Sequence, residues 1–187
     1  MDHRISLKWV TVLLVACLPL VSGCSGTLAT LGDDRSRSQT VTDNEIVLNI
    51  NKRLLTETNR DLFFNVTTDV FEGRVMLTGT VKKEADRQRA AKLVSGLPGV
   101  RTLYNDIQLA TDGGIGASAN AAWIDAKVRA QLVSAKNVKL LNYRLRVVNS
   151  TVFLLGRARN AAEKGEVMRI VRQTSRVRGI VDHVTGG

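Results

Sequence analysis

The sequence contains an internal repeat, which limits the folds open to it more strongly than any other feature. The pattern Val-x-Leu-x-Gly occurs at Val75–Gly79 and again at Val152–Gly156, 77 residues later in a chain of 187. The same order of apolar patterns surrounds both copies, and a segment rich in Gly, Ala and Ser at 110–120 separates them. Two similar halves of roughly 70 residues predict two small domains of one fold rather than a single large core.

Each half begins with a helical pattern and continues with strands. Residues 45–55 and 123–133 place apolar side chains four apart, which predicts a helix with one buried face. Alternating runs at 65–81 and 143–158 follow, and the polar pairs Glu72-Gly73 and Asn149-Ser150 at their centres predict hairpin turns. A second helical stripe and a short last strand complete each half. We therefore expect an α+β fold of two tandem α-β-β-α-β domains, with two helices on one face of each small sheet.

The N-terminal residues have the layout of a secretory signal peptide. Arg4 and Lys8 precede an apolar block at 9–21, which is too short for an ordinary transmembrane helix. Both cysteines, Cys17 and Cys24, follow an apolar residue and two small ones, which resembles a bacterial lipobox. We favour Cys24 as the lipidated residue because cleavage before it uses the whole apolar block. A plain signal peptide with an unmodified Cys, or an uncleaved anchor, remains the alternative.

These features divide the chain into five segments. They are a lipoprotein signal peptide at 1–23, a lipidated flexible tether at 24–42, a first domain at 43–110, a linker at 111–119 and a second domain at 120–187. Below, the first domain is called the first repeat and the second domain the second repeat.

The residues that carry chemistry in enzymes are scarce. No cysteine follows Cys24, which excludes a disulfide or a thiolate metal site in the folded body. His183 is the one histidine outside the signal peptide, and its place near the C-terminus predicts a side chain facing solvent. No Gly-rich phosphate loop, HExxH or GxSxG motif occurs. We expect no catalytic residues, no metal, no cofactor and no small-molecule substrate.

The positive charge belongs to the second repeat. Residues 120–187 carry 13 Lys and Arg against four Asp and Glu, whereas residues 43–109 carry ten against nine. This imbalance predicts an anionic partner. Nucleic acid would fit the isoelectric point of 10.2, but an exported protein rarely meets it and stacking aromatics are few. An anionic phospholipid membrane is therefore the expected partner, since it attracts basic residues by ~1 kcal/mol each.

One helix face offers a contact with such a membrane. If the apolar stripe of residues 123–133 faces the core, Trp123 lies at the edge of that stripe with Lys127 beside it. An indole prefers the headgroup level of a bilayer, and an ammonium group meets lipid phosphate. Packing of Trp123 under the neighbouring domain or the linker is the alternative. The candidate lipid contacts are Trp123, Lys127, Arg129, Arg169, Arg172 and Arg176.

The two halves resemble the BON domain, a bacterial periplasmic module. The resemblance rests on the apolar spacing of the first helix, on the Val-x-Leu-x-Gly-x-Val strand at 75–81 and on the Gly-Val-x-x-Leu-x-Asn-x-Ile ending at 99–107. The second copy differs, with Arg176 in place of Gly99 and Ser150 in place of Gly73.

A lipobox followed by two such domains resembles dual BON-domain outer-membrane lipoproteins. That resemblance implies a non-catalytic, lipid-anchored protein that faces the periplasm, binds phospholipid and supports envelope integrity. Ser25 after Cys24 favours the outer membrane by sorting rules of enteric bacteria. The alternative is an adaptor that binds an envelope protein or a cell-wall polymer through exposed Tyr104 or Phe71 of the first repeat.

Overall fold

The computed structural model divides the chain into two units, residues 1–32 and 33–187, and both repeats lie in the second unit. It describes residues 36–56, 60–110 and 114–186. The predicted signal peptide, both cysteines and most of the predicted tether lie outside these residues. Within them, no helix combines the length and the apolar character needed to cross a membrane.

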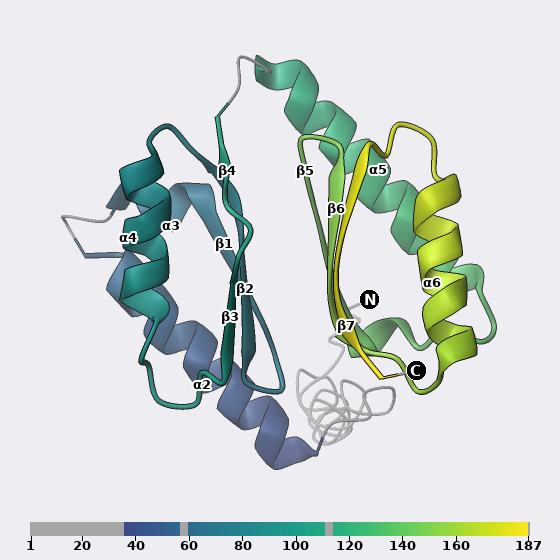
Figure 1. The fold of residues 1–187 in the computed structure, drawn as a ribbon, viewed down its shortest axis with the longest axis horizontal. Helices are drawn as coiled ribbons and strands as arrows, with labels where there is room; N and C mark the ends of the chain where they lie inside the picture. The colour runs from purple at the N-terminus through teal and green to yellow at the C-terminus, as the bar shows by residue number, and fades with distance from the viewer. Residues whose placement is uncertain (1–35, 57–59, 111–113, 187) are drawn as a thin grey trace, which may run out of the picture. The chain divides into compact units, whose positions relative to one another are not determined.

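The described residues of the first repeat form three helices and four strands, which Figure 1 shows in their arrangement. In chain order they are α2 (Arg37–Leu54), α3 (Arg60–Asn65), β1 (Val66–Phe71), β2 (Arg74–Val81), α4 (Glu84–Val94), β3 (Thr102–Asn105) and β4 (Gln108–Leu109). Strand β2 is central in the sheet. It pairs with β1 in antiparallel orientation and with β3 and β4 in parallel orientation.

The second repeat has the same plan. Its elements are α5 (Gly114–Ser134), the 3-10 turn η2 (Leu140–Asn142), β5 (Tyr143–Val148), β6 (Thr151–Arg157), α6 (Ala161–Gln173) and β7 (Gly179–Thr185). Strand β6 pairs with β5 antiparallel and with β7 parallel. The predicted α+β class and the predicted α-β-β-α-β order are confirmed in both repeats.

The two sheets share one register at a constant offset of 77 residues. Asp69 pairs with Met76 in the first sheet, and Arg146 pairs with Phe153 in the second. The parallel pairs follow the same offset, since Arg74 pairs with Thr102 and Thr151 pairs with Gly179. The repeat seen in the sequence is therefore a structural repeat at the level of individual strand pairs.

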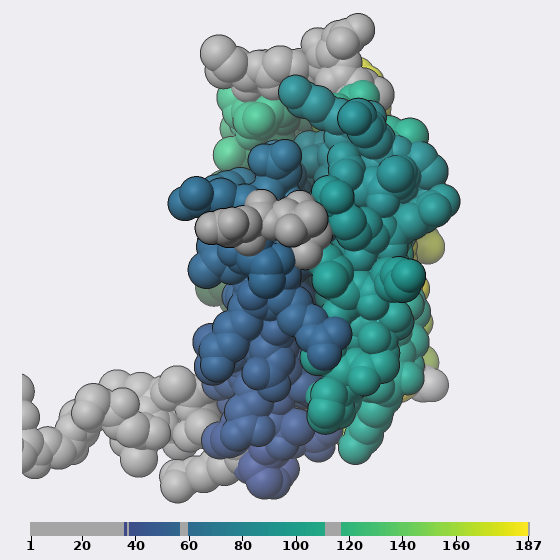
Figure 2. Space-filling model, turned by 90° about the vertical axis from the view of Figure 1, so that its left-hand side faces the viewer, coloured from purple at the N-terminus to yellow at the C-terminus, as the bar shows by residue number. Residues whose placement is uncertain are grey.

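Each repeat has its own hydrophobic core between its helices and one face of its sheet. In the first repeat, Ile46 and Ile50 of α2 and Val94 of α4 pack against Val75 and Leu77 of β2. An equivalent cluster in the second repeat joins residues of α5 and α6 to β5 and β6. Helices α2 and α4, coloured blue and teal, lie side by side over the outer face of the first repeat (Figure 2).

The glycine of the repeated strand motif has a steric cause. A Cβ atom on Gly79 would lie 2.0 Å from the Asn65 carbonyl oxygen, and one on Gly156 would lie 2.2 Å from the Asn142 carbonyl oxygen. Real Cβ atoms do not approach an oxygen so closely. In each repeat, the carbonyl group just before the first strand of the hairpin packs against the second strand at the motif glycine, where any side chain would clash with it.

Two segments with loop-like composition are helical. Residues 37–42 of the predicted tether belong to α2, and residues 114–119 of the predicted linker belong to α5. The Ser36 side chain accepts a hydrogen bond from the Gln39 N–H and caps α2, while Ala117 and Ala119 favour helix in α5. The short helix α3 was not predicted at all.

A third hydrophobic cluster joins the two repeats. The composition of the linker does not predict whether the two repeats pack together. Phe71 and Met76 of the first repeat are buried with Phe153 and Leu155 of the second. Alternation along the strands puts these side chains on the sheet faces that point away from the helices. The two sheets therefore cover each other's second face.

Candidate functional site

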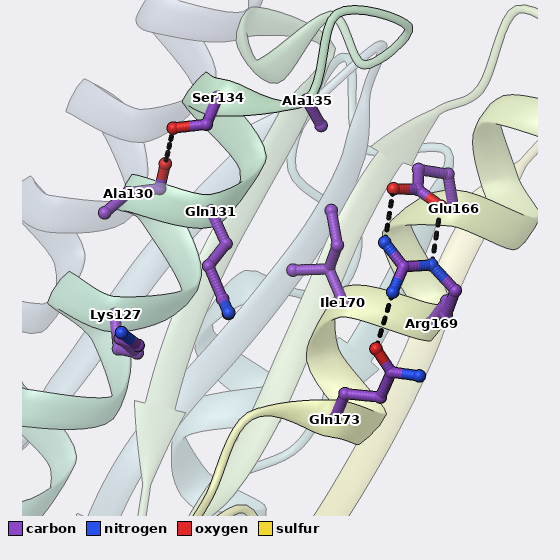
Figure 3. A pocket seen from close by; sticks show the side chains of 9 residues that line it. All are labelled: Lys127, Ala130, Gln131, Ser134, Ala135, Glu166, Arg169, Ile170 and Gln173. Atoms are coloured by element: carbon purple, nitrogen blue, oxygen red, sulfur yellow. Dashed lines mark hydrogen bonds and ion pairs between the residues drawn. The ribbon is translucent and has the colours of Figure 1, made fainter.

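A groove of about 510 Å³ runs between α5 and α6 of the second repeat (Figure 3). Helix α5 contributes Lys127 and Gln131 to one wall, and α6 contributes Arg169 and Gln173 to the other, with Ile170 between them. Its full lining is Lys127, Ala130, Gln131, Ser134, Ala135, Glu166, Arg169, Ile170 and Gln173. Two of the six predicted lipid contacts, Lys127 and Arg169, thus lie on opposite walls of one groove.

Trp123 and Arg176 lie in contact beyond the Lys127 end of this groove. The Arg176 guanidinium carbon lies 4.4 Å from the centre of the Trp123 ring, a cation–π distance. The Trp123 side chain is still 38% exposed. Since Trp123 is one helical turn before Lys127, the two side chains occupy the same side of α5.

Arg176 is held by an unusual backbone. Its φ is 70°, in the left-handed region where a residue with a side chain is strained. The equivalent position of the first repeat is Gly99, with φ of 86°. The second repeat therefore keeps a glycine conformation but places an arginine there, and its guanidinium covers the indole.

The predicted cations differ in how far their charges are compensated. Arg169 donates to both oxygens of Glu166, at 2.7 and 2.6 Å, and this hydrogen bonding lowers the pKa of the Glu166 carboxyl and raises that of Arg169. Arg129 donates to both oxygens of Asp125 and to the Leu145 carbonyl. Their charges are shared with neighbouring carboxylates.

Lys127, Arg172 and Arg176 have no ion-pair partner among the described residues, and all three side chains are exposed. Ion pairs take up at least six of the 13 cations of the second repeat: Arg129, Arg146, Arg157, Arg159, Lys164 and Arg169. The excess of cations in the sequence is therefore smaller in the folded protein. The cations without a carboxylate partner among the described residues include Arg176, which contacts Trp123, and Lys127, one helical turn after Trp123.

The contacts between the repeats were missed by the sequence analysis. Arg146 donates to both oxygens of Asp69 at 2.7 and 2.9 Å, which raises the pKa of Arg146. Arg157 pairs with Glu72 at 3.0 Å. Arg74 donates to carbonyl oxygens of β7 and β6, at 2.9 and 2.8 Å. Acids of the first repeat thus meet cations of the second.

The prediction that His183 faces solvent is wrong. Its side chain is 17% exposed, its ring stacks on Tyr104 at a centroid distance of 3.7 Å, and its Nε2 lies 2.8 Å from Asp106 Oδ2. The expected exposure of Phe71 is also wrong, since Phe71 is 1% exposed. His183 and Phe71 both lie in the contact between the repeats. There, Phe71 packs with Phe153 and Leu155 of the second repeat, and Tyr104 stacks on His183.

The strand patterns did contain a signal for this contact. Residues Val152–Leu155 are four consecutive apolar residues, and Val75–Leu77 are three. A strand with only one buried face alternates, so an unbroken apolar run indicates burial on both faces. That pattern shows that the second face is covered, but it does not identify what covers it.

The comparisons with known proteins agree with this architecture. The family model of the BON domain matches residues 42–111 and again residues 120–186. The chain belongs to the BON-domain family, with two copies in tandem.

Three relatives show how widely this family's members differ in their descriptions. An uncharacterized protein in the gshII 5' region of Anaplasma centrale is 29% identical over 77% of this chain and 94% of its own length. The 21 kDa hemolysin of Actinobacillus pleuropneumoniae is 28% identical over 61% of this chain and 60% of its own. The outer membrane lipoprotein DolP of Haemophilus influenzae is 22% identical over 78% and 76%. The chain is therefore similar to a dual BON-domain protein of the DolP type.

Proposed function

We propose that this protein is a non-catalytic envelope lipoprotein, anchored through Cys24, whose second repeat binds anionic phospholipid through the end of the α5–α6 groove. The observation that carries the proposal is the contact between Trp123 and Arg176, with Lys127 one turn away. It presents an indole beside uncompensated cations on one exposed surface. Similarity to an outer membrane lipoprotein supports the location at the outer membrane, facing the periplasm.

The chemistry of this surface suits a lipid headgroup. The half-exposed indole can enter the headgroup layer, while Lys127, Arg172 and Arg176 meet lipid phosphates. Each engaged cation contributes ~1 kcal/mol on an anionic surface. An acylated Cys24 keeps the body close to a bilayer, so contacts that are individually weak suffice for reversible docking.

The alternative of an adaptor that uses Phe71 or Tyr104 loses its support. Phe71 is buried in the contact between the repeats, and Tyr104 is partly buried there with its ring stacked on His183. A protein partner of the first repeat would have to contact α2, α3 or α4 instead.

Flotation with lipid vesicles tests the docking surface on residues 25–187, which include the whole compact unit 33–187. Wild type is expected to float with vesicles containing phosphatidylglycerol or cardiolipin and to remain below neutral ones. Trp123→Glu is expected to abolish flotation. Phe64 is an exposed aromatic of the first repeat, at 71%, and Phe64→Glu is the matched control that leaves binding intact. Equal recovery on neutral and anionic vesicles would contradict the proposal.

The anchor needs a separate experiment in cells. Palmitate labelling of wild type and of Cys24→Ala, followed by membrane fractionation, is expected to show label and outer-membrane recovery only for wild type. Persistent label in Cys24→Ala would move the anchor to Cys17.

A further inference from the structure

Two contacts between the repeats join residues that occupy the same position in each repeat. Asp69 bonds to Arg146, and Asp106 bonds to His183. In both contacts the partners are 77 residues apart, the offset that relates the two sheets pair by pair. Each residue therefore meets its own counterpart.

That relation is the mark of a twofold axis. In a symmetric dimer, the same patch is used by both partners, and a residue that meets its own copy lies on the axis. The apolar cluster between the repeats obeys the same relation, because Met76 and Phe153 are counterparts and both are buried in it. The two repeats thus contact each other as the halves of a symmetric dimer would. We call Asp69–Arg146 and Asp106–His183 the axis pairs.

The side chains of the axis pairs have diverged in charge. If two first repeats met through this face, Asp69 would meet Asp69 and Asp106 would meet Asp106. If two second repeats met, Arg146 would meet Arg146. The Asp69 side chain is only 6% exposed, so like charges at this position would repel with little screening by water.

Contacts away from the axis also differ between the two repeats, because residues that bond across the contact have counterparts that cannot form the same bond. Arg74 reaches two carbonyl oxygens of the second repeat, whereas its counterpart Thr151 is too short to return such contacts. Glu72 pairs with Arg157, whereas the counterparts of these residues are the uncharged Asn149 and Thr80. The Arg74 hydrogen bonds and the Glu72–Arg157 ion pair thus favour pairing of a first repeat with a second repeat over pairing of two first repeats or of two second repeats.

We propose that the sheet face of each repeat is a docking surface for a BON domain, and that the opposite charges of Asp69 and Arg146 select the sibling repeat and reject a like repeat of a second copy of this chain. Opposite charges attract within one chain, and the same charges repel when like repeats meet. Repulsive elements of this kind give specificity that apolar contacts alone lack. The exposed sheet faces of a chain whose repeats have separated would therefore not self-associate through like repeats.

Charge reversal at one axis pair tests this selection in residues 25–187. Asp69→Arg makes both axis residues basic, Arg146→Asp makes both acidic, and the double variant exchanges them. Each single variant is expected to lower the midpoint of thermal unfolding by roughly 5–10 °C. The double variant is expected to return to within about 3 °C of wild type. A double variant no more stable than the weaker single variant would overturn the proposal.

Mixing the two single variants tests partner choice directly. When they are partially unfolded and refolded together, an acidic residue at position 69 or 146 can find a basic one at these positions only on the other chain. Sedimentation is expected to show a complex of two chains in the mixture and single chains in each separate sample. Dimers in either separate sample, or single chains only in the mixture, would overturn the proposal.

A matched control uses an ion pair within one repeat. Asp125 and Arg129 both belong to α5, and reversing them cannot create complementarity between repeats. A mixture of Asp125→Arg and Arg129→Asp is therefore expected to sediment as single chains.

Discussion

The Arg176 guanidinium covers the Trp123 indole at 4.4 Å from a backbone position with φ of 70°, where the first repeat has Gly99. A left-handed backbone costs a residue with a side chain of order 1 kcal/mol or more. The cation–π contact recovers roughly 0.5–1 kcal/mol at an exposed site. The two terms nearly offset each other, so fold stability alone gives arginine little advantage over glycine here.

Arg176→Gly is therefore expected to separate stability from function. The free energy of unfolding should change by less than about 1 kcal/mol, because relief of the backbone offsets the lost contact. Binding to anionic vesicles should fall, since a cation beside the indole is lost. Urea titration and flotation of the same samples check both results. Arg176→Lys, which keeps the charge, is the control and should retain most of the binding.

Neutralising the uncompensated cations should weaken vesicle binding in a salt-dependent way. Lys127→Gln with Arg172→Gln removes about 2 kcal/mol of attraction, which corresponds to a roughly 30-fold weaker partition onto anionic vesicles at low salt. The difference should shrink as salt is added. The control is Lys82→Gln with Lys83→Gln, an exposed pair of the first repeat with the same change in net charge. Equal losses in both double variants would show that only net charge matters.

Glu163 should make the second repeat sensitive to acid. Its side chain is 1% exposed, and its carboxylate accepts from the backbone N–H groups of Lys139 and Arg159 and from the Arg159 side chain. Burial alone would raise the pKa of Glu163, but these donors together hold it below the ordinary value of 4.5. The unfolded chain then binds the proton first, so this stabilisation is complete above pH 4.5 and is lost as the pH falls toward the lower, folded pKa.

Glu163→Gln is expected to lower the free energy of unfolding at pH 7 by roughly 2–4 kcal/mol, because buried donors lose a charged acceptor. The loss should diminish in acid. Urea midpoints between pH 7 and pH 3 measure this, with Glu166→Gln, a partly exposed carboxylate of the same helix, as the control. Wild-type and Glu163→Gln curves that run parallel down to pH 3 would contradict the assignment.

The glycine of the strand motif should tolerate no side chain. Gly79→Ala places a Cβ against the Asn65 carbonyl oxygen, so we expect a loss of about 3 kcal/mol or more in the free energy of unfolding. Gly165 lies in α6, and a Cβ added there would have no neighbouring atom within 4 Å. Gly165→Ala is the control and should stabilise the protein by roughly 0.5–1 kcal/mol. Similar effects of both substitutions on the urea midpoint would refute the steric explanation.

The sequence predicted what depends on local periodicity. The apolar stripe of α5 was sufficient to place Trp123 and Lys127 on one side of that helix, and the offset between Gly79 and Gly156 was sufficient to align the two sheets. It did not predict that Arg176 would reach Trp123, because a loop after α6 carries Arg176 there. It also missed His183, whose burial depends on which face of one sheet meets the other. That choice is made by contacts between residues far apart in the chain.

Because the two sheets cover each other, substitutions are tolerated best on the helical layers of this protein. Among the described residues, the strands are committed to each other, and the helical layers are the broad surfaces left to the surroundings. Substitutions on the outward side of those layers disturb neither the cores nor the pairing of the repeats. The outward side of one repeat can therefore change over evolutionary time while that of the other is retained.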